Sequence, residues 1–389
     1  MGSSVMSRRA ALRRFTLAVP LAATLLRLSG ASVGMAEILG SAHMLWKQRG
    51  AVDFAAWQLA GVGVGPDGAI ELRDAELDAQ GRGVGAATGP VVQVPRGFRE
   101  LIVSWNASTG EDGWIDVSAR ASLAEGWSRW YVLGVWSTGD TAHRHSVDGQ
   151  DDAAARVLTD TLALESSSQQ FQVRVGLHGP ARVSIVTAVA TDHVAYAPGA
   201  DEGAARGRVL DVPVRSQMVY PGGGEVWCSP TSTSMVMAYW ARVTGDGSMD
   251  RTVPDAAVGT YDPVYRGNGN WPFNTAFAAS HGLIAYVTRL ASVAEMEPWI
   301  QSGVPLVASV AWQPGELPQA PIRSTNGHLL VVVGVAEDGA VVVNEPAADP
   351  RLGQPVRRTY PRRTFERLWQ MASHGAVYVI YPANWPVPN

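Results

Sequence analysis

The sequence predicts an α+β protein with an N-terminal β-sandwich and a C-terminal domain in which helices precede an antiparallel sheet. Three observations support this prediction. The 41 Gly, 24 Pro and 14 Trp among 389 residues are typical of short strands joined by turns rather than of a helical bundle. Residues 50–192 alternate between apolar and polar side chains, as half-buried strands do. Helical spacing of apolar residues begins only after residue 209.

Length and composition limit the class of protein. A chain of 389 residues is long enough for about two domains. Apolar residues make up 46% and charged residues 17% of the chain, and the formal net charge is −4. This composition excludes a disordered tail and a basic nucleic-acid binder. We therefore expect a globular protein without a nucleic-acid partner.

The N-terminus predicts export. The run from Ser7 to Leu12 reads SRRAAL and resembles a twin-arginine signal, and residues 15–26 after it are apolar. A membrane span needs about 20 apolar residues, and Arg27 interrupts this stretch, so we expect no stable membrane span after processing. Residues 1–36 are therefore predicted to be a signal peptide cleaved after Ala36, and the mature protein to be secreted or held at the cell surface. The alternative is a disordered basic leader. Cleavage would remove five arginines and no acid, which takes the formal charge to −9.

The domain boundaries follow from changes in pattern. Residues 37–192 form the predicted β-sandwich. The small residues of 193–207 form the predicted linker, and 208–389 form the second domain. The sandwich strands are predicted at 101–105, 114–117, 130–136, 171–175 and 183–186. In the second domain, helices are predicted at 230–241, 274–280, 293–301 and 364–371, and strands at 306–310, 328–335, 341–344 and 376–381.

Cys228 is the first candidate for chemistry. It is the only cysteine, so it cannot form an intramolecular disulfide, and a lone thiol in an oxidising compartment is a liability unless it is buried or used. It follows the glycines of 222–224 and precedes Ser229-Pro230 at a predicted helix start. A helix N-terminus and a nearby imidazolium lower a thiol pKa, which predicts a nucleophile. The commoner alternative is a buried cysteine that acts as a small apolar residue.

His328 is the candidate partner. Gly327-His328 begins an otherwise apolar strand, where a histidine is costly to bury unless an acceptor receives its N–H. An acid on the neighbouring strand would supply that acceptor and would stabilise the imidazolium.

The identity of this acid depends on the hairpin register. A two-residue turn at 338–339 pairs Glu345 with Val332, which puts Glu345 on the same face as His328, whereas Asn344 faces the other way. A bulge or strong coiling would bring Glu345 closer to the histidine.

The same register leaves a second candidate open. It places Asp349 directly opposite His328, although Pro346 and Pro350 indicate that the strand has ended before this point. The order of preference is Glu345, Asp349, then Asn344.

Four motifs follow one another along the C-terminal half: Gln217, Trp227-Cys228-Ser229-Pro230, Gly327-His328 and Asn344-Glu345-Pro346. In this order they resemble the peptidase C39-like family of papain-like cysteine peptidases, over about residues 208–385. The N-terminal β-rich segment resembles the N-terminal region of actinobacterial members. The family usually has Asp at the position of Glu345.

The resemblance implies a papain-like C-terminal domain and a set of roles. Cys228 would be the nucleophile, His328 the general base and acid, Glu345 the orienting acid, and Gln217 a donor that polarises the oxyanion.

The other candidates concern substrate and metal binding. Trp227 beside the nucleophile is expected to contact substrate. Trp271 would line a substrate cleft or, alternatively, would anchor its turn from the core. His143 and His145 lack a third ligand at suitable spacing, so no metal is expected. The glycines of 222–224 lack a following Gly-Lys-Ser/Thr, and no cofactor is expected.

The predicted function is an exported thiol-dependent hydrolase, with a peptide or protein substrate. One alternative is an amidase that uses the same residues on peptidoglycan stem peptides. Another is a non-catalytic surface protein whose β-sandwich captures glycan or protein.

Overall fold

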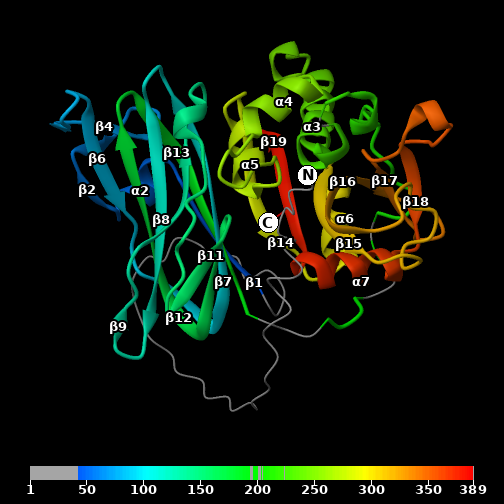
Figure 1. The fold of residues 1–389 in the computed structure, drawn as a ribbon, viewed down its shortest axis with the longest axis horizontal. Helices are drawn as coiled ribbons and strands as arrows, with labels where there is room; N and C mark the ends of the chain where they lie inside the picture. Colours follow the sequence, from blue (N-terminus) through cyan, green and yellow to red (C-terminus); the bar gives the residue numbers. More distant parts are fainter. Residues whose placement is uncertain (1–42, 193–195, 200–202, 204, 223, 389) are drawn as a thin grey trace.

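The computed structural model describes residues 43–192, 196–199, 203, 205–222 and 224–388. The predicted signal peptide lies outside these residues. Figure 1 shows a strand-rich N-terminal region beside a C-terminal domain that contains both helices and strands. Strands account for 41% and helices for 22% of the chain, so the α+β class fits the C-terminal domain better than the whole molecule. Among the described residues, no helix combines the length and the apolar character needed to cross a bilayer.

Within residues 43–192, thirteen antiparallel strands and one short α-helix build the N-terminal region. They are β1 (His43–Arg49), α2 (Gly50–Phe54), β2 (Gln58–Ala60), β3 (Val62–Val64), β4 (Ile70–Leu72), β5 (Glu76–Leu77), β6 (Gly83–Thr88), β7 (Val92–Thr109), β8 (Trp114–Leu123), β9 (Gly126–Trp127), β10 (Tyr131–Trp136), β11 (Ala155–Leu158), β12 (Thr161–His178) and β13 (Ala181–Thr191). Four of the five predicted strand segments lie within these elements, and the fifth, 130–136, begins one residue before β10; Trp46, Trp105 and Trp136 are buried in the core between them.

The strands form one hydrogen-bonded network, whereas a β-sandwich has two separate sheets. The reason is the length of β7 and β12, which run for 18 residues each. β12 pairs with β11 in its first half, with β6 and β8 in its second half, and with β7 from Thr161 to Phe171. Register shifts between Ala163 and Gln170 mark the change of partners, because bulges let a strand bend.

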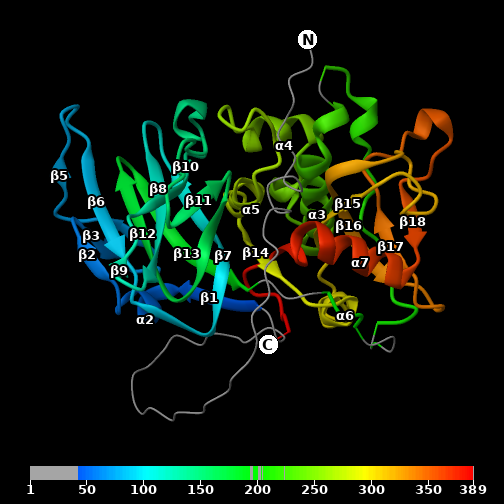
Figure 2. The same cartoon turned by 60° about the horizontal axis from the view of Figure 1, so that its bottom comes forward.

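In its described residues, 205–222 and 224–388, the C-terminal domain combines five α-helices with a six-stranded sheet. The helices are α3 (Cys228–Thr244), α4 (Val253–Thr260), α5 (Trp271–Ala279), α6 (Val293–Gln301) and α7 (Arg362–Ser373). The strands are β14 (Leu283–Arg289), β15 (Leu306–Trp312), β16 (Thr325–Val335), β17 (Val341–Asn344), β18 (Arg357–Tyr360) and β19 (Ala376–Pro382). Their spatial order is β14-β19-β15-β16-β17-β18, and every pair is antiparallel. Helix α3 packs on β16 and α7 packs on β15, and Figure 2 shows the helices around the sheet. The predicted helices and strands of this domain are confirmed, with small changes at their ends.

Three elements of this domain were not predicted. Helix α4 carries a capping box between Thr252 and Asp255, a signal that the sequence contained. Strand β14 is buried along its whole length, so it lacks the alternation of a half-buried strand. Strand β18 reads Arg-Arg-Thr-Tyr and lies at the edge of the sheet, where charged residues are common.

The described part of the predicted linker is held against the C-terminal domain. The Tyr196 hydroxyl and the Gly199 N–H both donate to Glu366 of α7. The Ala205 N–H donates to Glu297 of α6 at 2.8 Å. These contacts fix the path of the chain before it reaches the first residues of the candidate site.

Candidate active site

Cys228 is the first residue of α3, and its side chain is half-buried. Trp227 occupies the cap position, where it makes no side-chain capping bond, and the thiol lies at the N-terminal, partially positive end of the helix. Gly224 packs tightly in the preceding loop: a Cβ at this position would lie 2.1 Å from the Gln217 carbonyl oxygen. The predicted helix start is confirmed. Glycine is needed at position 224 because two backbone segments approach each other closely there.

His328 lies near the start of β16, which packs against α3. Ser232 of α3 donates to the Leu329 carbonyl at 3.1 Å and ties the helix to this strand. The imidazole is only 3% exposed and meets Trp312 edge to face. It forms a hydrogen bond with the Cys228 side chain. Because its Nε2 is engaged elsewhere, this contact belongs to Nδ1.

Glu345 holds the other side of the imidazole. Its Oε1 lies 2.5 Å from His328 Nε2 and also accepts the Ala347 N–H at 3.0 Å. Its Oε2 accepts the Tyr360 hydroxyl at 3.1 Å. The carboxylate is fully buried, and both of its oxygens have donors. The structure therefore brings Cys228, His328 and Glu345 together in the predicted order.

The predicted hairpin register was wrong by two residues. The turn has three residues, 337–339, rather than two, with Gly339 at a φ of +88°. A bulge between Val332 and Gly334 adds a second shift, and Asn344 pairs with Val331. Two shifts of one residue each move Glu345 nearer to His328 and leave it on the same face.

The two lower-ranked acceptors have other partners. Asp349 caps a short 3-10 helix and pairs with Arg351 at 2.8 Å. Asn344 donates to the Val212 carbonyl at 3.1 Å and accepts from Arg357 at 3.1 Å. Asp349 therefore stabilises a turn, and Asn344 fastens the chain that leads to Gln217.

Gln217 is buried between the loop before Cys228 and the segment after Glu345. Its backbone N–H donates to the Pro346 carbonyl at 2.9 Å, and its Nε2 donates to the Glu225 carbonyl at 2.7 Å. An amide nitrogen carries two hydrogens, so the second remains able to serve another acceptor. This geometry keeps the amide close to the start of α3.

Two family models match the chain. The model described as Peptidase C39 N-terminal domain matches residues 44–195, and the model described as Peptidase_C39 like family matches residues 209–377. The chain belongs to the peptidase C39-like family. Its C39-like domain thus follows an N-terminal β-rich domain that other family members also carry.

Solved structures and curated proteins were also compared. The chain is similar to a candidate C39-like peptidase from Bacillus anthracis, with 17% identity over 44% of this chain and 96% of that chain and a TM-score of 0.29. It is also similar to the C-terminal CBM6 of LamC from Zobellia galactanivorans, with 13% identity over 37% of this chain and 98% of that chain and a TM-score of 0.21. Proteins of curated function gave no match.

The charges in the C39-like site favour an ion pair between thiolate and imidazolium. Burial by itself raises the pKa of the Cys228 thiol, but hydrogen bonds from His328 and from the Leu329 N–H, together with the His328 charge, lower this pKa below its ordinary value of 9.0. Burial lowers the pKa of His328, but the Glu345 charge and the hydrogen bonds on both sides of the ring raise it to about 10. Burial raises the Glu345 pKa, but the His328 charge together with the hydrogen bonds from His328, the Ala347 N–H and Tyr360 lowers it below its ordinary value.

The two tryptophans differ in their positions. Trp227 is half-buried beside the C39-like nucleophile position and lies 6.1 Å from the Tyr220 ring. Trp271 was expected to line a substrate cleft, but its side chain is only 4% exposed and belongs to the hydrophobic core. The alternative interpretation of Trp271, a core residue that anchors its turn, therefore describes the structure.

Tyr360 is the site residue that the sequence did not reveal. It ends β18 with a buried ring, and its hydroxyl donates to Glu345. The only signal was an aromatic residue after three polar ones, and it could not be interpreted because β18 itself was not predicted.

The predicted surface histidines make local contacts. His143 Nδ1 lies 2.5 Å from Asp140, and His145 Nδ1 lies 3.0 Å from the Ser146 carbonyl oxygen. Within the described ranges, no group of three or more His, Cys, Asp or Glu could hold a metal.

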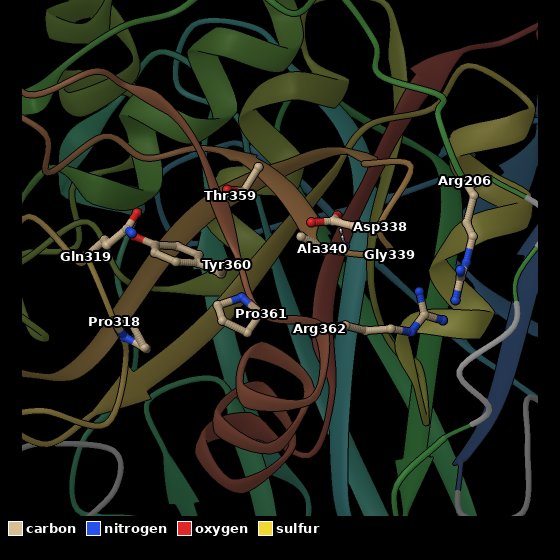
Figure 3. A pocket seen from close by; sticks show the side chains of 10 residues that line it. All are labelled: Arg206, Pro318, Gln319, Asp338, Gly339, Ala340, Thr359, Tyr360, Pro361 and Arg362. Atoms are coloured by element: carbon tan, nitrogen blue, oxygen red, sulfur yellow. Dashed lines mark hydrogen bonds between the residues drawn. The ribbon is translucent and has the colours of Figure 1, made fainter.

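A cavity of about 550 Å³ lies at the turn between β16 and β17, and Tyr360, whose hydroxyl donates to Glu345, is one of its lining residues. Figure 3 shows Arg206 and Arg362 on one side of it and Gln319 on the other. Neither Cys228 nor His328 lines this cavity, so it is separate from the thiol.

Proposed function

We propose that this protein is a cysteine peptidase that uses a Cys228-His328-Glu345 triad in a papain-like domain. The observation that carries this proposal is the buried imidazole of His328, which bonds to the Cys228 side chain on one side and to Glu345 on the other. Burial of an imidazole and a carboxylate costs folding free energy, and such pairs are concentrated at functional sites. This cost favours a catalytic function over a non-catalytic surface protein.

The mechanism begins with the thiolate of Cys228, which attacks the carbonyl carbon of a peptide bond and forms a tetrahedral intermediate. The second hydrogen of the Gln217 amide stabilises the oxyanion. His328 then donates its proton to the leaving amine, and a thioester to Cys228 remains. Water attacks the thioester while His328 accepts its proton, and the thiolate returns. Glu345 holds the ring and stabilises its charge throughout.

The working environment follows from the N-terminal motif. The twin-arginine motif supports export of the folded protein, with cleavage after Ala36. Such a route suits a chain with one cysteine, since the thiol would stay reduced in the cytosol during folding. The substrate is then a peptide or protein outside the cell, with Trp227 as a contact next to the nucleophile.

The experiment compares wild-type protein with Cys228→Ala and Cys228→Ser on fluorogenic peptides, casein and purified peptidoglycan. Turnover should be lost in both variants, while the thermal midpoint changes by only a few degrees, because a half-buried thiol contributes little to the core. Cleavage of casein or free peptides supports a general peptidase. Release of fragments from cell wall alone assigns the same triad to stem peptides. Full turnover in Cys228→Ala would overturn the proposal.

A further inference from the structure

The N-terminal domain covers an edge of the sheet in the C39-like domain. Strand β14 lies at the end of the six-stranded sheet. The Asn106 side chain from β7 donates to the Ala285 carbonyl at 2.5 Å and accepts the Ala285 N–H at 3.2 Å. Ser104 accepts the Val287 N–H at 3.0 Å. Side chains of one domain thus form hydrogen bonds with the backbone of an edge strand in the other. These bonds remove a site at which another strand could pair.

The same domain caps a helix of the C39-like domain. The fully buried carboxylate of Asp160 accepts the N–H of Trp271, the first residue of α5, at 2.7 Å. Asn270 accepts the Phe273 N–H at 3.3 Å in the same turn. A carboxylate at a helix N-terminus satisfies an N–H group and complements the helix dipole. Asp160 therefore holds the first backbone N–H of α5 beside the cap residue Asn270, and with it the position of Trp271.

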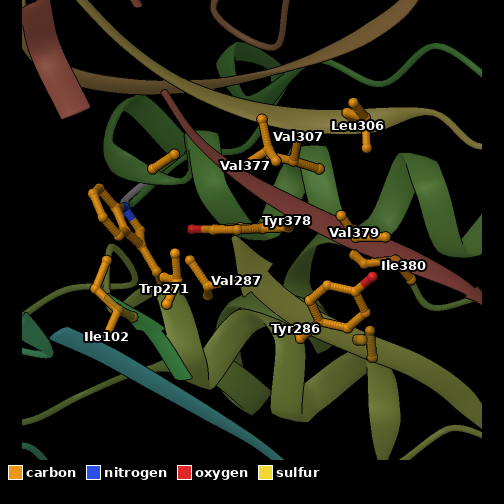
Figure 4. Packing of buried hydrophobic residues seen from close by; sticks show 14 of the residues in the cluster. Ile102, Trp271, Tyr286, Val287, Leu306, Val307, Val377, Tyr378, Val379 and Ile380 are labelled. Atoms are coloured by element: carbon orange, nitrogen blue, oxygen red, sulfur yellow. The ribbon is translucent and has the colours of Figure 1, made fainter. Parts of the chain in front are cut away.

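From Trp271 the contacts lead to the nucleophile. Helix α5 packs against β7 and β19. Figure 4 shows the Trp271 indole near Ile102 of β7, with the Tyr378 hydroxyl of β19 directed toward the indole. That hydroxyl lies 2.9 Å from Ser229 Oγ, and both residues are buried. Ser229 follows Cys228 in the first turn of α3.

We infer that the N-terminal β-rich domain positions the nucleophile through Asp160, Trp271, Tyr378 and Ser229, and that Asp160 and Tyr378 are positioning residues for the reaction. The inference rests on the proposed function of Cys228. The physical reason is that the sulfur moves with the first turn of α3, and displacement of a reacting atom by about 1 Å lowers rates strongly. A buried hydrogen bond on Ser229 restricts this motion.

The test measures the rate of Cys228 alkylation by iodoacetamide between pH 5 and 10 in the full-length protein. This rate reports the thiolate and its placement without any peptide substrate, so it remains informative even if peptide hydrolysis fails. Tyr378→Phe keeps the ring and removes only the hydroxyl. Tyr378→Phe should slow alkylation at pH 7 by about threefold to tenfold, which is the effect expected from the loss of one buried hydrogen bond. Asp160→Ala should act in the same direction, and Asp160→Asn, which keeps an acceptor, should restore most of the rate.

Ser104→Ala is the matched control, because it removes a buried bond between the two domains that lies off this path. Its alkylation profile should equal that of wild type, even though its thermal midpoint falls. The inference is overturned if Tyr378→Phe and Asp160→Ala also keep the wild-type profile. It is likewise overturned if Ser104→Ala slows alkylation as much as they do, because loss of stability alone would then explain the effect.

Discussion

The Tyr360 hydroxyl donates to one oxygen of Glu345 at 3.1 Å, while the other oxygen of the same carboxylate holds His328 at 2.5 Å. Glutamate has one more rotatable bond than the aspartate usual in this family, so the hydroxyl limits a freedom that aspartate lacks. The pair gives the longer carboxylate a fixed orientation toward the imidazole.

Tyr360→Phe should lower kcat several-fold and move the alkaline limb of the pH profile to lower pH. Loss of the donor frees the Glu345 carboxylate to rotate and weakens its hydrogen bond to the imidazolium, so the pKa of His328 falls from about 10. A pH-rate profile of peptide hydrolysis measures the shift. Tyr196→Phe is the control. The Tyr196 hydroxyl also donates to a carboxylate at 3.1 Å, but its acceptor is Glu366 of α7 rather than Glu345. An alkaline limb that stays in place in Tyr360→Phe would refute the coupling.

Glu345→Gln should reduce kcat/KM by a factor on the order of 10² to 10⁴, because the amide keeps the shape of the side chain but not the charge that stabilises imidazolium. Steady-state kinetics on a fluorogenic peptide measures the loss. Asp349→Asn should stay within about twofold of wild type, since Asp349 pairs with Arg351 rather than with His328. A larger loss in Asp349→Asn than in Glu345→Gln would reverse the assignment of the acid.

The rate of Cys228 alkylation should rise with pH already below 9.0, whereas the rate of peptide hydrolysis, which needs the His328 proton for the leaving amine, should fall as pH passes about 10. The rise follows the lowered pKa of Cys228, above which the thiolate forms. The fall follows the raised pKa of His328, above which the imidazolium is lost.

The raised His328 pKa also stabilises the fold. This contribution to stability is complete below pH 6.5, the ordinary pKa of histidine, and is lost above about pH 10. Chemical unfolding at pH 7 and pH 10.5 should therefore show lower stability at the higher pH. Equal stability of wild type and Glu345→Gln across this interval would contradict the linkage.

Glu100→Gln should lower the free energy of unfolding by about 3 to 5 kcal/mol. Glu100 of β7 lies 2.5 Å from Arg289 of β14, and both side chains are at most 2% exposed. The substitution leaves a buried guanidinium without its counter-charge at the contact between the two domains. Denaturant unfolding measures the change. Asp67→Asn serves as the control, because its pair with Arg182 is about half exposed and should contribute at most about 1 kcal/mol.

The sequence by itself located Cys228 and His328, and the reason is local. A glycine-rich loop before Ser-Pro predicts a helix start, and a histidine that opens an apolar run predicts a strand start, so neighbouring residues sufficed for both. It also predicted the main helices and strands of the C39-like domain from their periodicity. The parity of the hairpin placed Glu345 on the correct face.

Only the tertiary structure decided the distance between Glu345 and His328. The bulge in β16 occurs where the incoming segment bonds to it: Leu210 donates to the Val333 carbonyl, and Val335 donates to the Arg208 carbonyl. A Cβ on Gly334 would meet that same Arg208 carbonyl at 2.4 Å. The register thus depends on a segment more than a hundred residues earlier, and a hairpin pattern contains no information about it.

The same limit applies to Tyr360 and Trp271. Tyr360 reaches Glu345 because β18 pairs with β17, and Trp271 is buried because the N-terminal domain packs over α5. Local side-chain patterns determine which segments become helices and strands. The contacts of a buried side chain are decided by packing between segments distant in the chain, and so the distance from Glu345 to His328, the Tyr360 hydroxyl donor and the bond between Tyr378 and Ser229 were decided only in the folded protein.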